Sequence, residues 1–191
     1  MFLFPSVFIG LAIGLLLGGR IGRLAEVRLR APWLFYVAIG MQIVAFPSLV
    51  LPWSISEQLA TALSIGSYFC LSAVLFLNIR LRGLAIAGLG MLMNLAAILA
   101  NGGHMPALPE AMRGAGLTFD GVHNNSVASS DPNLGWFVDR FAAPSWLPMG
   151  NVYSVGDVLI GVGIALTVAA AMGARVTLVR RRGDATPASP G

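Results

Sequence analysis

Long apolar runs alternate with short polar segments along the whole chain. A helix needs about 20 apolar residues, at 1.5 Å each, to cross a hydrocarbon core about 30 Å thick. Five runs approach or reach that length, and they cover residues 3–19, 33–53, 58–79, 83–100 and 152–174. We therefore predict an all-α membrane protein with five transmembrane helices.

Composition supports lipid as the main solvent of this chain. Of the 191 residues, 57% are hydrophobic and only 10% are charged. Soluble domains carry about 25% charged residues, so this chain could not cover a water-facing surface. The length fits one domain. We predict a single membrane domain over 1–174, with the lipid bilayer as its partner, followed by a basic, disordered tail over 175–191.

Arginine positions predict how the chain is oriented. All twelve basic residues are arginine, and ten of them lie in the segments 20–30, 80–82 and 175–182. With five spans these segments share one side, which the positive-inside rule places in the cytoplasm. The N-terminus is then outside, and the protein is a multi-pass protein of a bacterial cytoplasmic membrane. Because topology already explains the arginines, we predict no nucleic-acid partner.

The segment 101–150 is far longer than a helical hairpin requires, and loops of this length are usually functional or disordered. Its aromatic residues argue for structure. In "SDPNLGWFVDRF", Ser130 or Asp131 can cap a helix with Pro132 in its first turn. Apolar residues follow at helical spacing: Leu134, Phe137, Val138 and Phe141. We predict a short amphipathic helix here, lying on the outer membrane surface or capping the bundle.

Small residues recur every fourth position in two of the predicted spans. The first span carries Ser6, Gly10, Gly14 and Gly18. The fifth carries Asp157, Gly161, Ala165 and Ala169. Such stripes allow close contact between helices in lipid. The first stripe packs either on the fifth span or on another molecule, a partner membrane protein or a second copy of the chain, and the sequence leaves both open.

Polar residues gather in the outer half of the predicted bundle. Helical rise places Asn94 and Asp157 each about 10 Å below the outer boundary, and Gln42, Ser67 and Tyr68 deeper. The candidate polar pocket consists of Asn94, Asn101, His104, His123, Asp139, Asn151, Ser154 and Asp157.

Each of these residues has a structural explanation beside the functional one. Ser154 and Asp157 fit a capping box, although an intramembrane carboxylate also suits a proton, cation or polar-substrate site. Asn94 and Gln42 can form interhelical hydrogen bonds or contact a ligand. Asn101, before two glycines, fits a helix C-cap and turn.

The two histidines lack a recognisable metal-ligand spacing. His104 and His123 could bind a metal with Asp120 or Asp139, but they lie nineteen residues apart, which is a weak signal. We predict no metal, no cofactor and no catalytic residues.

Four segments resemble motifs of a known family, in the same order and spacing. They are "NGGHMP" (101–106), "VHNNS" (122–126), "LGWFVDRFAAPSWLP" (134–148) and "NVYSVGDVLIGVG" (151–163). The chain is similar to a bacterial integral membrane protein family known as a domain of unknown function, with motifs NGG-x-MP and NV-x-S-x-GD. The resemblance implies a topology and a set of outer-face motifs, and no activity.

Three functions remain open. No HExxH, GxSxG, CxxC or P-loop motif occurs. The sequence favours a non-catalytic membrane module or complex subunit with a polar pocket under an outer cap. The alternatives are a small transporter or sensor that uses Asn94 and Asp157, or a membrane-embedded enzyme acting on a lipid-linked substrate at the outer leaflet.

Overall fold

The computed structural model describes residues 3–46, 55–117, 122–123, 126–143 and 152–174. Within these ranges the chain is mostly helical, with seven helices. They are α1 (Leu3–Leu16), the 3-10 helix η1 (Ile21–Glu26), α2 (Trp33–Ala45), α3 (Glu57–Leu77), α4 (Leu84–Ala100), α5 (Pro109–Gly114) and α6 (Val155–Ala171).

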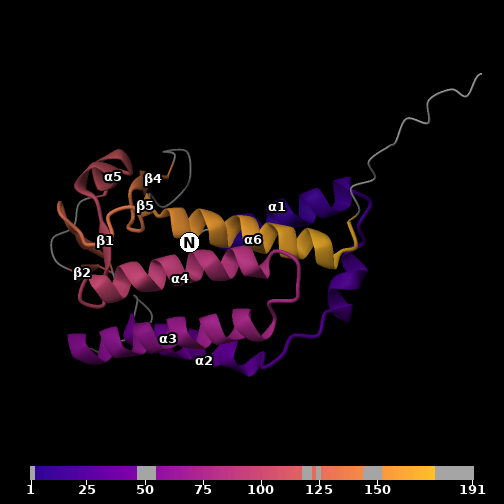
Figure 1. Ribbon diagram of the computed structural model, residues 1–191, viewed down its shortest axis with the longest axis horizontal. Coiled ribbons are helices and arrows are strands. Elements are labelled where there is room, and N and C mark those ends of the chain that lie inside the picture. Colours follow the sequence, from indigo (N-terminus) through magenta and orange to yellow (C-terminus); the bar gives the residue numbers. More distant parts are fainter. Residues whose placement is uncertain (1–2, 47–54, 118–121, 124–125, 144–151, 175–191) are drawn as a thin grey trace, which may run out of the picture.

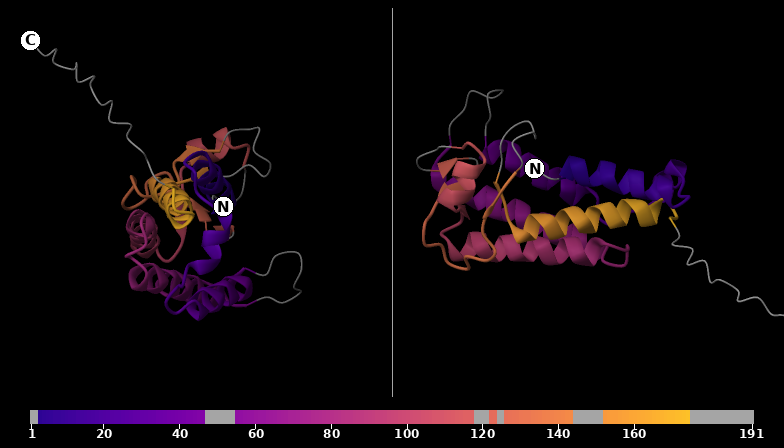
Figure 2. Two further views of the ribbon diagram at one scale, coloured as in Figure 1. Left: turned by 90° about the vertical axis from the view of Figure 1, so that its right-hand side faces the viewer. Right: turned by 90° about the horizontal axis from the view of Figure 1, so that it is seen from above.

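The five long apolar helices run side by side along the long axis of the molecule (Figure 1). Helix α6 packs between α1 and α4, and α3 packs between α4 and α2, so the helices follow one another along a curved path in the order α1–α6–α4–α3–α2 (Figure 2, left). Each predicted apolar segment contains one of these helices. Among the described residues α3 alone, with 21 residues, is long and apolar enough to span a membrane, and the other four helices are apolar but shorter.

The small-residue stripes allow α1 and α6 to pack closely. A Cβ on Gly10 would lie 2.6 Å from the Ala165 carbonyl oxygen, and one on Gly161 would lie 2.8 Å from Ser6 Oγ. Gly14 likewise faces Met172. A Cβ added to Gly18, just past the end of α1, would have nothing within 4 Å. The first three residues of the α1 stripe thus pack within the chain.

Residues between α4 and α6 form a small folded unit at one end of the helices, on the left in Figure 1. We call its described residues, within 101–153, the cap. Its first sheet has the order β1 (Met105–Ala107), β3 (Ser126–Ala128), β2 (Val122–His123), with β1 and β3 parallel. In its second sheet β4 (Phe141–Ala142) pairs antiparallel with β5 (Val152–Tyr153).

The cap has an apolar core of its own and shares a second one with the helices. Its own core consists of Ala107, Ala111, Met112 and Val152. The shared core consists of Ala97, Ile98, Met105 and Val138, with Tyr68 and Ile65 of α3 packed against it. The cap therefore rests on α3 and α4.

The amphipathic helix predicted around residues 132–141 is wrong. Residues 133–137 form turns, Leu134 has a positive φ of 53°, and an isolated bridge at Asp139 precedes β4. The physical reason is a competing set of backbone bonds. The Asp139 N–H donates to Pro106 O, and its carbonyl accepts from the Leu108 N–H, both at 2.9 Å, which holds this segment extended beside β1.

Candidate functional site

Asp157 closes a capping box at the start of α6, as its spacing from Ser154 predicts. Its backbone N–H donates to Ser154 Oγ, and its Oδ2 accepts from the Ser154 N–H, each at 3.0 Å. Both bonds satisfy N–H groups that have no partner within the helix. The carboxylate also favours the positive end of the helix dipole.

The same two residues bind α4 through Asn94. Asn94 Nδ2 donates to Asp157 Oδ1 at 2.9 Å. The Ser154 hydroxyl lies 2.8 Å from Asn94 Oδ1 and 3.0 Å from Asp157 Oδ2, and its single proton serves one of these acceptors at a time. Asn94 and Ser154 are buried. We call Asn94, Ser154 and Asp157 the polar junction.

Glycines bring the two helices close enough for these bonds. A Cβ on Gly156 would strike the Asn94 side chain and lie 2.7 Å from Gly90 O. A Cβ on Gly90 would meet Gly156 O and lie 2.9 Å from the Ile160 nitrogen. Both positions therefore need glycine because backbone lies opposite.

Asp139 is a buried carboxyl beside the junction. It is 7% exposed, and its neighbours fasten it on both sides: Val138 lies in the core shared with α4, and the Arg140 N–H donates to Tyr153 O at 3.1 Å, next to Ser154. Burial, and then the nearby Asp157 carboxylate, raise the pKa of Asp139 from 3.8 to about 8, because both disfavour its charged form. The N-terminal amino group acts in the opposite direction and has a smaller effect.

No hydrogen bond or ion pair reaches the Asp139 carboxyl from the part of the chain that the structure describes. Arg140, the nearest basic residue in sequence, turns away: its guanidinium carbon lies 4.2 Å from the centre of the Trp136 ring. Asp139 is thus a buried acid without a compensating positive group among the described residues.

Asn101 fastens the cap rather than joining the junction. It is the C-cap of α4 and is followed by Gly102 and Gly103 with positive φ, the predicted turn. Its side chain exchanges bonds with the backbone of Asn133, 2.9 Å in each direction, and Asn133 Nδ2 donates to Ala100 O at 3.0 Å. These bonds clamp the 133–137 turn to the end of α4.

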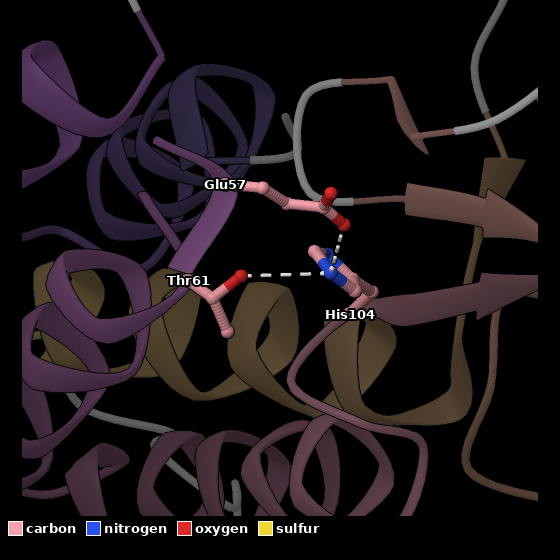
Figure 3. A network of polar contacts seen from close by, with 3 residues as sticks. All are labelled: Glu57, Thr61 and His104. Carbon is pink, nitrogen blue, oxygen red and sulfur yellow. Dashed lines mark hydrogen bonds and ion pairs between the residues drawn. The ribbon is translucent and has the colours of Figure 1, made fainter. Parts of the chain in front are cut away.

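His104 lies in a separate network with α3 (Figure 3). Its Nε2 is 3.5 Å from both Glu57 Oε1 and Thr61 Oγ1, whereas its buried Nδ1 has no hydrogen-bond partner among the described residues. No group of three metal-ligating side chains occurs among the described residues. The side chain of His123 and the whole of Asn151 lie outside the described part.

The predicted pocket therefore separates into three places. Asn94, Ser154 and Asp157 are bonded together with Asp139 beside them, whereas Asn101 and His104 have partners of their own. Gln42, noted deeper in the bundle, forms an interhelical hydrogen bond to Ser67. Sequence reasoning missed Asn133 and Gly156, since neither carries a signal until the partner helix is placed.

Comparison with known proteins yields a family and no activity. Residues 26–169 match DUF5317, a family of unknown function. Neither curated proteins nor solved structures gave a match.

Proposed function

The chain belongs to the DUF5317 family, whose function is unknown, and we propose from its structure that it is a five-span protein of the bacterial cytoplasmic membrane acting as a non-catalytic module. In this proposal the N-terminus and the cap face the outside, and the tail faces the cytoplasm.

One observation carries the membrane part of the proposal: the long helices expose large apolar side chains and bury small or polar ones. Leu16, Phe76 and Tyr36 are 85%, 74% and 73% exposed. Ser64 and Ser67 are fully buried, and Asn94 is nearly so. Water disfavours such a surface, whereas lipid accepts it and favours small and polar residues at helix contacts.

Helix lengths are compatible with this proposal when the cap is included. The helices α4 and α6 have 17 residues each, about 25 Å at 1.5 Å per residue. Both join the cap directly, and its buried backbone pairs can lie within the headgroup region without exposing unpaired polar groups to lipid.

Cysteine labelling tests the topology, because Cys70 is the single native cysteine. In a Cys70→Ser background, Glu110→Cys in α5 and Glu26→Cys in η1 both place a thiol at an exposed position. We expect an impermeant thiol reagent to label Glu110→Cys in intact cells and Glu26→Cys only after permeabilisation. Labelling of both in intact cells would contradict the five-span proposal.

The module part of the proposal is supported by how the polar residues are used. Asp157 is engaged in three hydrogen bonds that start α6 and join it to α4. The cap is held rigidly, by a shared core and the Asn101–Asn133 clamp, and it presents Trp136, 73% exposed, with Arg140 against its ring. Tryptophan and arginine are enriched at protein interfaces.

Site-directed crosslinking tests the module. A photoreactive amino acid at position 136 should give one discrete crosslinked species in cells, whereas the same group at position 26, at the opposite end of the helices, should not give that species. Absence of any product from 136 and from the neighbouring exposed position 134 would contradict a partner on this surface.

A second candidate is a small sensor or transporter, and Asp139 is the observation that favours it. A buried acid with no positive partner among the described residues is costly for stability, and ionisable groups retained in membrane proteins often serve function. Loss of activity in an Asp139→Asn variant that still folds would favour this candidate over the module.

A further inference from the structure

We propose that Asp139 is a proton-binding site, filled from the outer aqueous phase, and that its proton holds the cap against the helices. The inference deepens the sensor candidate above and rests on it. The reaction is uptake of one proton by a carboxylate to give a neutral carboxylic acid, and no other reactant is needed.

Asp139 lies at the contact between the cap and the helices. Its backbone is bonded on both sides to β1, through Pro106 and Leu108. The preceding Val138 is fully buried against α4, and the following Arg140 is bonded to Tyr153 at the start of α6. Residue 139 therefore lies where the cap meets the helices, and only 7% of it is exposed.

The groups that act on Asp139 together favour its neutral form. The titratable groups acting on Asp139 from the packed helices are Tyr68 of α3 and Asp157 of α6, and α4 contributes the neutral Asn94. Neither helix supplies a cation. The N-terminal amino group of the chain does act on Asp139, but it lowers the pKa by less than burial and Asp157 raise it. Asp139 is buried and Asp157 is half-buried, so ionising Asp139 costs its hydration and adds repulsion from the Asp157 carboxylate.

A proton fits this place better than a metal ion. Hard cations need several oxygen ligands with free lone pairs. Asp157 Oδ1 and Oδ2 and Asn94 Oδ1 already accept hydrogen bonds from groups within the junction. A proton needs only the Asp139 carboxyl itself.

Loss of the proton should loosen the cap. Ionised Asp139 would be a buried charge that the Asp157 carboxylate repels, and moving the cap away would return it to water. This movement would strain two contacts: the packing of Val138 in the shared core and the backbone hydrogen bonds between residue 139 and the β1 segment. A rise in external pH would thus loosen the contact between the cap and the helices.

Infrared difference spectroscopy of the full chain in nanodiscs tests the site. The protonated-carboxyl band should titrate with a midpoint near pH 8. It should vanish in Asp139→Asn and persist in the matched control Asp131→Asn, an exposed aspartate of the same segment. Asp157→Asn should lower the midpoint, because it removes the neighbouring charge.

Two results would overturn the site. One is a band that survives Asp139→Asn. The other is a midpoint that falls when sodium chloride replaces choline chloride, because a competing metal ion would then be the ligand. A normal helical circular dichroism spectrum of Asp139→Asn is the check that the variant folds.

Hydrogen exchange tests the link to the cap. Above the midpoint, the amides of β1 and β3 should exchange faster in the wild type than in Asp139→Asn at the same pH. Equal exchange would overturn the coupling while leaving the proton site in place. Neither experiment depends on the labelling pattern or the crosslinks, so failure here is separable from failure of the module.

Discussion

Gly90 offers a direct test of how closely α4 and α6 pack. Replacing it with alanine adds one methyl group opposite Gly156 O, 2.9 Å from the Ile160 nitrogen and 2.9 Å from Leu159 Cβ. Two of these three neighbours are backbone atoms, so α6 must shift as a unit. That shift would also stretch the hydrogen bond of Asn94, one turn further along α4.

The matched control lies in the same helix. Gly88 has a helical backbone and nothing within 4 Å of the position of its added Cβ. Each glycine-to-alanine change contributes a similar gain in helix propensity, about 0.5–1 kcal/mol. The difference between the two variants therefore isolates the steric cost at Gly90, which overpacking data put at about 1–3 kcal/mol.

Reversible unfolding in mixed micelles, followed by circular dichroism, measures this difference. We expect Gly88→Ala to be as stable as the wild type or slightly more so, and Gly90→Ala to be less stable. Because the clash is with backbone, side-chain repacking cannot relieve it. Equal free energies of unfolding for the two variants would refute the close α4–α6 contact and, with it, the geometry of the polar junction.

Three further outcomes are expected. Asp157→Asn should keep most of the capping, whereas Asp157→Leu should lose about 0.5–2 kcal/mol of unfolding free energy, a ranking that thermal unfolding checks. Asn133→Ala should release the clamp on Asn101 and increase proteolysis within the cap, with α-helix content unchanged by circular dichroism. The pKa of Asp139 is raised from 3.8 to about 8, so the folded state holds a proton that the unfolded state has lost, and stability should fall as pH rises across that window, by about 1.4 kcal/mol per unit of pH. Asp139→Asn should remove this dependence, and an unchanged slope in that variant would contradict the assignment to Asp139.

Local signals along the chain are sufficient to locate the helices, but not all of their ends: the predicted span 33–53 contains a helix that ends at Ala45, and residue 152, where the fifth span was predicted to begin, lies in β5. Apolar runs predict where α1, α2, α3, α4 and α6 lie, because a helix satisfies its own backbone and needs no distant partner. The Ser154–Asp157 box and the turn after Asn101 are predictable for the same reason: every bond involved lies within a few residues.

Only the tertiary structure decided how the cap is built. Apolar residues from 134 to 141 have helical spacing, yet the segment pairs with β1, some thirty residues earlier in the chain. Strand pairs depend on distant partners, and such short strands carry little pattern of their own. The apolar residues of this segment thus repeat with the 3.6-residue period of a helix, although the segment is not helical.

The use of the small-residue stripe and of Asp139 was likewise settled by contacts between distant segments. The sequence left the α1 stripe open between a partner and the fifth span, and the structure packs Ser6, Gly10 and Gly14 against α6. The sequence marks Asp139 as one of eight candidate pocket residues but does not show that it is buried. The pKa of Asp139 is raised because folding removes water from its carboxyl and brings the Asp157 carboxylate, eighteen positions away, near it.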